Sequence, residues 1–327
     1  MLGFPFMILV LGKDRPEAIL FAFLLCYAIA ALGNGISNVP VWVLLGTSLD
    51  SRWRARMLGL TSAGVGVLML GIAPLIGIVL SSAGPAFPNN YALLFGAAGL
   101  LLVLSILPIV FVHELPAGKV LEKIPSLAEY LPSLGHVLRT DSAFRAMLIT
   151  RMLTSLFAMA SPFYIGFATV QLGLSSTVAV PVLLAMQTIG GVSGALIYTW
   201  LGARRNVMYI RLALGVAALL PVSALLATVI GPLPLYLGFL VSGLTVAQLF
   251  DSYQNWVITY ATPDQRPMYA GLFNTVGAVI LLMAPIIGGT IVQQVGYEAL
   301  FVVALAMVLA ALFVALRYIH HPRTAAS

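Results

Sequence analysis

Charge is scarce in this chain. Charged residues make up 8% of its 327 residues and hydrophobic residues 61%, whereas a soluble domain carries about a quarter charged residues. Residues 57–112 and 152–203 contain no Asp, Glu, Lys or Arg. Each run is long enough for two membrane crossings, because one transmembrane helix needs about 20 apolar residues. The composition argues against a soluble all-α protein, which would need a polar face.

Residues that bind metals or form disulfides are equally rare. Cys26 is the single cysteine, so the chain has neither a disulfide framework nor a CxxC motif. The adjacent pair His320-His321 fits a solvated tail better than a metal site. The sequence also lacks a Gly-x-x-x-x-Gly-Lys-Ser/Thr phosphate loop, which disfavours an ATP-driven permease. No nucleophile or acid pair gathers within the apolar runs, so we predict no cofactor, no metal and no enzymatic activity.

The apolar runs predict an all-α, polytopic membrane protein. Breaks at proline, glycine and charge clusters leave nine full spans, at roughly 17–47, 57–82, 89–112, 144–171, 174–200, 206–230, 233–260, 268–292 and 297–319. Residues 1–12 form a further apolar piece that is too short to cross alone. This piece is also too poor in positive charge for an ordinary signal peptide.

The net charge of +6 follows the topology and does not indicate a nucleic-acid partner. Of the 16 Lys and Arg residues, only Lys13 and Arg15 lie outside every second connection between spans. This positive-inside asymmetry places the C-terminus and the segment 113–143 in the cytoplasm. We therefore predict a multi-pass protein of the cytoplasmic (plasma) membrane, with the lipid bilayer as its surroundings.

Two distant parts of the chain repeat each other. At one constant offset, Asn34, Trp42, Asp50 and Arg52 match Gln248, Trp256, Asp264 and Arg266. After a gap of about three residues, Pro74-Leu75-Ile76-Gly77 matches Pro285-Ile286-Ile287-Gly288. A repeat of two membrane helices at this spacing is typical of transporters whose two halves arose by duplication.

The repeat predicts the domain organisation. Residues 1–112 would form a partial N-terminal bundle, 113–143 a cytoplasmic linker, 144–319 a six-helix bundle and 320–327 a cytoplasmic tail. Within the linker, leucines at helical spacing between Leu127 and Leu138 suit an amphipathic helix on the membrane surface. Projecting the repeat back predicts a twelve-helix protein that lacks its first two helices and part of the third.

These features resemble the major facilitator superfamily over essentially the whole chain. The resemblance lies in the six-helix half, the linker, the turns Asp50-Ser51-Arg52 and Asp264-Gln265-Arg266, and the prolines Pro74 and Pro285. The segment from Gly66 to Gly77 resembles the family's antiporter motif, although Ala73-Pro74 replaces Gly-Pro. The segment Gly194 to Arg205 resembles the turn after the family's eighth helix but lacks its aspartate, which puts a carboxylate gate at that turn in doubt.

The resemblance implies two rocking helix bundles around a central cavity. In the family the first, fourth, seventh and tenth helices line that cavity, and the last three correspond here to 17–47, 144–171 and 233–260. The distribution of polar residues supports the same assignment independently, because these three spans hold most of the intramembrane polar side chains. Gln248, Asp251, Ser252 and Asn255 share one helical face.

Asp251 and Arg151 form the sharpest hypothesis. Both lie on the order of 10–14 Å from the inner ends of their helices at 1.5 Å per residue. A charge at that depth is costly, and it is usually paired or faces a water-filled pathway. We predict an ion pair that opens when a proton or solute arrives. A static structural bridge, or an arginine extending to the interface, is the alternative.

The predicted functional residues fall into two groups. The substrate-contact or coupling group is Asp251, Arg151, Asn34, Asn38, Gln248, Asn255, Trp42 and Gln187. The cytoplasmic gating turns contain Asp50, Arg52, Arg56, Asp264, Arg266, Arg204 and Arg205. Aromatic residues such as Phe157, Tyr164 and Tyr253 favour a lipophilic or amphipathic solute, as in drug efflux. Because Arg151 is positively charged, an organic anion is an alternative substrate.

The sequence thus predicts a secondary active transporter of a small organic solute. It would work by alternating access as a monomer, coupled to protons. The alternative is a fragment that does not transport, or that works only with another chain, because the first helix of the family normally supplies one wall of the cavity.

Overall fold

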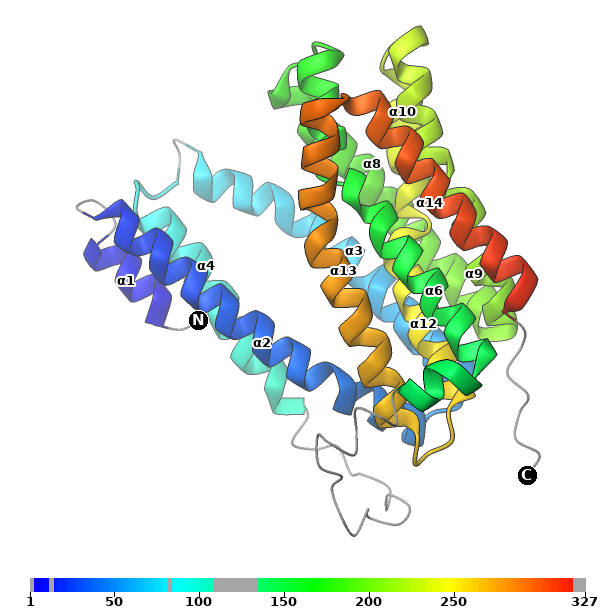
Figure 1. Ribbon diagram of the computed structural model, residues 1–327. Coiled ribbons are helices and arrows are strands. Elements are labelled where there is room, and N and C mark those ends of the chain that lie inside the picture. Colours follow the sequence, from blue (N-terminus) through cyan, green and yellow to red (C-terminus); the bar gives the residue numbers. More distant parts are fainter. Residues whose placement is uncertain (1–2, 12–14, 82–83, 109–134, 320–327) are drawn as a thin grey trace. The chain divides into compact units, whose positions relative to one another are not determined.

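The computed structural model describes residues 3–11, 15–81, 84–108 and 135–319, and these residues are helical apart from short turns (Figure 1). No strand occurs among them. The predicted all-α membrane fold is confirmed. His320-His321, the tail 320–327 and most of the predicted linker helix at 127–138 lie outside the described residues.

The described residues before the linker form four α-helices. They are α1 (Gly3–Leu11), α2 (Pro16–Ser48), α3 (Ser51–Leu80) and α4 (Asn89–Ile106). The chain turns sharply between α2 and α3 because a carboxylate oxygen of Asp50 accepts a hydrogen bond from the backbone N–H of Trp53 at 2.8 Å. This contact satisfies a donor at the start of α3 that has no partner within the helix.

The chain after the linker is also helical, and several of its helices are interrupted. In order they are α6 (Ser142–Phe157), η2 (Ala158–Ala160), α7 (Phe163–Gly166), η3 (Phe167–Gln171), α8 (Ser176–Ile197), η4 (Tyr198–Gly202), α9 (Ala203–Ala217), α10 (Leu219–Ile230), α11 (Leu233–Gly243), α12 (Val246–Tyr260), α13 (Arg266–Gln294) and α14 (Tyr297–Tyr318). Two of the interruptions, η3 and η4, are single π-helical turns.

Six helical stretches of the described chain are long and apolar enough to cross a membrane, judged by length and composition. One of them, Ala179–Ile230, has 52 residues. A straight helix of that length would measure about 78 Å, more than twice the roughly 30 Å of a bilayer core. Arg205 breaks it with a non-helical backbone (φ −145°, ψ 63°). Its length and this break fit two crossings, as the predicted spans 174–200 and 206–230 expect.

The chain divides into two compact units. The first comprises Met1–Leu44 and Leu68–Ala117, and the second comprises Leu45–Val67 and Gly118–Ser327. Residues 45–67, which join α2 to α3, thus belong with the helices that follow the linker. The four-part division predicted from the sequence stays a prediction.

The core of the second unit surrounds α6. This helix packs against α13 and α14, as Figure 1 shows, and α8 packs against α11. Beyond α6, Tyr164 stacks on Phe301 with ring centroids 4.8 Å apart. Asp141 fixes the start of α6: its carboxylate accepts hydrogen bonds from the backbone N–H of Phe144 and from the hydroxyls of Tyr260 and Tyr269 at 2.8–2.9 Å. These contacts hold α6 beside the ends of α12 and α13.

Candidate functional site

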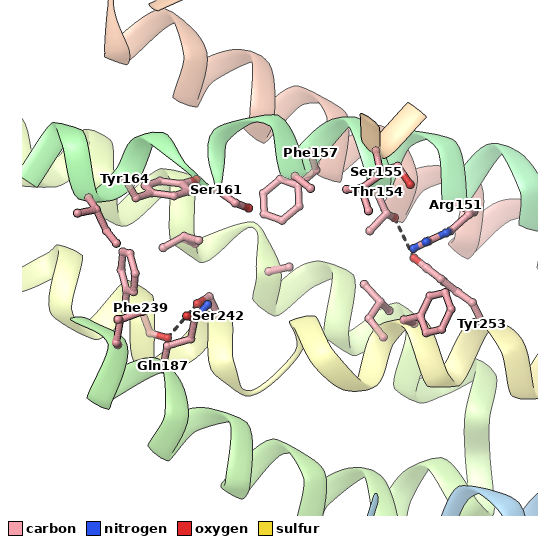
Figure 2. Close-up of a pocket in the computed structure, with 18 residues that line it drawn as sticks. Arg151, Thr154, Ser155, Phe157, Ser161, Tyr164, Gln187, Phe239, Ser242 and Tyr253 are labelled. Atoms are coloured by element: carbon pink, nitrogen blue, oxygen red, sulfur yellow. Dashed lines mark hydrogen bonds between the residues drawn. The ribbon is translucent and has the colours of Figure 1, made fainter. Parts of the chain in front are cut away.

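A cavity of about 520 Å³ lies within the second unit, among α6, α8, α11 and α12. This volume falls in the range of roughly 300–1,000 Å³ that is usual for small-molecule sites. Figure 2 shows Arg151, Thr154, Ser155 and Tyr253 at one end, Tyr164, Phe239, Gln187 and Ser242 at the other, and Phe157 and Ser161 between them. The cavity is therefore charged at one end and aromatic at the other.

Arg151 lines this cavity without a hydrogen-bonding partner. Its Nε is buried, and no guanidinium nitrogen makes a hydrogen bond to the part of the chain that the structure describes. Instead the guanidinium carbon lies 4.9 Å from the ring centre of Phe250 and 5.9 Å from that of Phe273. Such cation–π contacts offset part of the cost of burying the charge. They leave its N–H donors free.

Two further cavity residues carry buried polar atoms without partners. These atoms are Oγ of Ser155 and the hydroxyl of Tyr164. Ser155 lies four residues after Arg151, so the two side chains share one face of α6. Buried polar groups are normally hydrogen-bonded. Both residues line the cavity, so these orphaned groups are candidates to bind a polar solute.

The predicted ion pair between Asp251 and Arg151 is wrong for this structure. No carboxylate oxygen lies within 4.0 Å of the Arg151 guanidinium among the described residues. The reason is that Phe250 and Asp251 are neighbours on α12, and successive side chains of a helix point about 100° apart. Phe250 lines the cavity, whereas Asp251 does not and lies near the buried Tyr198 and Tyr209 instead.

Of the other predicted substrate contacts, Gln187 of α8 lines the cavity. Gln248 instead donates a hydrogen bond from Nε2 to the carbonyl of Gly191 at 3.3 Å. Trp42 is buried in α2 but is not a cavity residue. Asn34 and Asn38 belong to α2, and their side chains lie outside what the structure describes. The transport roles of these residues stay predictions.

A second polar site, which we call the latch, joins the α2–α3 turn to the end of α12. Arg54 is 2% exposed. Its Nε donates to Oδ1 of Asn255 at 2.7 Å, and another nitrogen donates to Oγ1 of Thr259 at 2.8 Å. The guanidinium also donates to the carbonyls of Leu45 and Leu49 at 3.4 and 3.1 Å. Arg54 therefore binds the C-terminal ends of two helices at once, where a cation is favoured.

Arg266 makes the reciprocal contact from the other repeat. At the start of α13, its Nε donates to the carbonyl of Ile258 at 3.1 Å, and a second nitrogen donates to the carbonyl of Gly46 at 3.0 Å. Each arginine thus binds the helix that precedes it and the matching helix of the other repeat. The latch consists of Arg54 and Arg266 with these partners.

The remaining predicted gating residues lie outside the latch. Arg52 and Asp264 are exposed, and Asp50 caps α3. Two arginines lie against exposed tryptophans, Arg56 on Trp53 and Arg204 on Trp200, each 5.0 Å from the ring centre. Arg205 is exposed and carries the break inside α9. Their role in gating stays a prediction.

Sequence reasoning missed Arg54 and Gly277. Arg54 was one of three alternating arginines after a predicted span, and nothing in that pattern distinguishes the buried one. Gly277 gives Arg151 its space, because a Cβ there would lie 2.6 Å from Nε of Arg151. Asn255, in contrast, was singled out on the polar face of α12, and the structure places that face partly in the latch.

Comparison with known proteins gives one family and two structural neighbours. The model of the Major Facilitator Superfamily matches residues 1–284, while no curated protein sequence matches significantly. The human organic anion transporter MFSD10 (TETRAN) is similar to this chain with a TM-score of 0.70 at 18% identity. The match covers 96% of this chain and 74% of the MFSD10 chain. A bacterial homologue of the iron transporter ferroportin, in an outward-facing state, has a TM-score of 0.64 at 14% identity, covering 92% and 73%. At these identities the likeness shows the fold alone.

Proposed function

Because the chain belongs to the Major Facilitator Superfamily, we propose that it moves a small organic solute across the membrane by alternating access, with the cavity as its binding site. The family and the structural neighbours support membrane transport. The observation that carries the proposal is that α12 serves both sites. Tyr253 of α12 lines the cavity, and Asn255 and Thr259 of the same helix bind Arg54 in the latch. A solute that shifts α12 would therefore act directly on the latch.

The sidedness of the proposed cycle follows from the charge pattern. The positive-inside rule assigns the α2–α3 turn to the cytoplasm, so the intact latch would correspond to a closed cytoplasmic end. Breaking it would open the cavity inward. The aromatic lining supports a lipophilic or amphipathic solute, as in drug-type efflux. We keep a cytoplasmic-membrane location, a cytoplasmic C-terminus and a monomeric state as parts of the proposal.

Filling the cavity tests the proposal. Ala158 lines the cavity beside Phe157, and Ala158→Trp would occupy much of its volume. We expect solute counterflow in proteoliposomes to fall by about ten-fold or more, since overpacking a site excludes its ligand. Ile149→Trp is the control, because Ile149 lies on the same helix and is 39% exposed. Equal losses in the two variants would count against the cavity. If the unmodified chain moves no solute, the alternative of a non-transporting or partner-dependent fragment would be favoured.

We further propose that Asp251 couples transport to protons. It is partly buried in α12, does not line the cavity, and lies near the buried Tyr198 and Tyr209. Asp251→Asn mimics the protonated carboxyl. Accumulation driven by a pH gradient should therefore fall about ten-fold or more, while solute exchange without a gradient continues. Glu298→Gln removes an exposed carboxylate from α14 and should change neither. An unaltered pH dependence in Asp251→Asn would rule out this role.

A further inference from the structure

Arg151 gives the cavity a positive charge that no carboxylate of the described residues neutralises by an ion pair. Resting on the proposed transport function, we propose that the solute is an amphipathic organic monoanion, a carboxylate or a sulfonate. Its charged group would bind Arg151 and Ser155, and its apolar body would extend toward Phe157, Tyr164 and Phe239.

The first step is that the guanidinium of Arg151 has no counter-charge beside it among the described residues. No carboxylate of the described chain lies within 4.0 Å of the guanidinium, and Asp251 does not line the cavity. The flanking Phe250 and Phe273 stabilise the cation through their ring faces but do not cancel its charge. A fixed cation in surroundings of low dielectric attracts an anion strongly and repels a cation. The charged end of the cavity therefore favours an anionic solute over a cationic one.

The second step is the set of free donors at that end. Thr154 uses its hydroxyl hydrogen on the carbonyl of Thr150 at 2.8 Å, so the 2.9 Å contact between Thr154 and Tyr253 must use the hydrogen of Tyr253. Both of these hydroxyl hydrogens are therefore occupied. The buried Nε of Arg151 and Oγ of Ser155 have no partner. Because these two side chains share one face of α6, they can bind the same anionic group.

The third step is the shape of the rest of the cavity. Tyr164 lies thirteen positions after Arg151, which corresponds to roughly 20 Å along a helix. Phe157, Tyr164 and Phe239 line the cavity in this direction, as Figure 2 shows. Ser242 already donates its hydroxyl hydrogen to the carbonyl of Phe239 at 2.9 Å. One cation at one end, and aromatic rings toward the other end beside the Tyr164 hydroxyl and Gln187, fit a solute with a single negative charge and a mainly apolar body.

Three matched probes test the inference on the full-length chain in lipid nanodiscs at pH 7. They are 6-phenylhexanoate, its neutral amide 6-phenylhexanamide and the cation 6-phenylhexylamine, and calorimetry measures their equilibrium binding. We expect the carboxylate to bind about ten-fold or more tightly than the amide, and the amine to bind most weakly. Equal affinities for carboxylate and amide, or a preference for the amine, would overturn the inference without any variant.

Arg151→Gln should lower the affinity for the carboxylate to that for the amide, while leaving the amide affinity unchanged. Arg151→Lys keeps the charge but loses the planar fork, so it should retain part of the preference. Arg145→Gln is the matched control. It removes an exposed cation from the same helix, one that donates to the carbonyls of Leu138 and Arg139. A preference that survives in Arg151→Gln, or that is lost equally in Arg145→Gln, would contradict the assignment.

A second variant keeps the test decisive if Arg151→Gln does not fold. In Gly277→Ala the new Cβ would meet Nε of Arg151 at 2.6 Å, which displaces the guanidinium but keeps its charge. We expect about ten-fold weaker binding of the carboxylate only. In Gly289→Ala, on the same helix, the nearest atom is Cζ of Phe163 at 3.5 Å, and binding should not change. If Gly277→Ala also leaves carboxylate binding unchanged, the inference is wrong.

Transport measurements separate this inference from the proposed function. If the carboxylate binds through Arg151 but does not cross the membrane in counterflow, the transport proposal fails and the anion site stands. If carboxylate and amide cross equally well and bind equally well, transport stands and the anion site fails.

Discussion

Arg54→Gln is expected to break the latch and to shift the chain by about a hundred-fold toward the state that is open at the cytoplasmic end. Arg54 is 2% exposed and donates hydrogen bonds to Asn255, Thr259 and two backbone carbonyls. A hydrogen bond from a charged group contributes about 1.5–3 kcal/mol. Glutamine can replace only part of this set, and a loss of roughly 3 kcal/mol changes an equilibrium about a hundred-fold.

Labelling of a cysteine in the cavity would measure this shift. The reporter is Ser155→Cys in a Cys26→Ser background, because Cys26 is the single native cysteine and Ser155 lines the cavity. A membrane-impermeant maleimide applied to the cytoplasmic side should react about ten-fold or more faster in Arg54→Gln. Active transport should fall, because the cycle needs the latch to close again.

Arg52→Gln is the matched control for this prediction. Arg52 lies on the same turn of α3 but is exposed, and exposed substitutions change stability by less than about 0.5 kcal/mol. Its labelling rate should stay within about two-fold of the unmodified chain, which would exclude the gating role predicted for Arg52 from the sequence. If Arg52→Gln accelerates labelling as much as Arg54→Gln, general electrostatics would explain the effect. If Arg54→Gln labels at the unmodified rate, the contacts of Arg54 do not hold the cytoplasmic end closed.

The contrast between the exposed Arg52 and the buried Arg54 shows what the sequence can and cannot predict. The membrane spans follow from the length of apolar runs, since the bilayer fixes how many residues a crossing needs. The repeat of Asn34 to Arg52 at Gln248 to Arg266 led to the fold, because it compares the chain with itself. Neither signal reports which side of a helix packs against its neighbours. Arg52 was therefore placed in the predicted gate, and the buried Arg54 was not.

The same limit explains the error over Asp251 and Arg151. Counting residues from the helix ends gave a similar depth for both side chains, and depth alone suggested a pair. Pairing also requires the right direction around each helix, and this depends on tertiary packing. Phe250 takes the cavity-facing position next to Asp251. Gly277, which makes room for Arg151, could not be recognised because its role depends on how α13 approaches α6.

Gly190→Ala is expected to lower the melting temperature of the purified chain by about 10 °C or more and to abolish solute binding. A Cβ at Gly190 of α8 would lie 1.9 Å from the carbonyl oxygen of Leu240 in α11. Ordinary contacts lie near 3.5 Å, so the helices would have to separate by roughly 1.5 Å. The obstructing atom is backbone and cannot rotate away. Small residues allow such close approach between membrane helices.

The neighbouring residue provides a control with the opposite expected sign. At Gly191, the next position in α8, a Cβ would lie 3.9 Å from the carbonyl oxygen of Gly243. Gly191→Ala should therefore fit, and it should stabilise α8 by up to about 1 kcal/mol, since alanine favours a helix over glycine. Because α8 and α11 carry Gln187 and Phe239 of the cavity, separating them would also deform the binding site. Equal melting temperatures for the two variants would show that α8 and α11 do not approach so closely at Gly190.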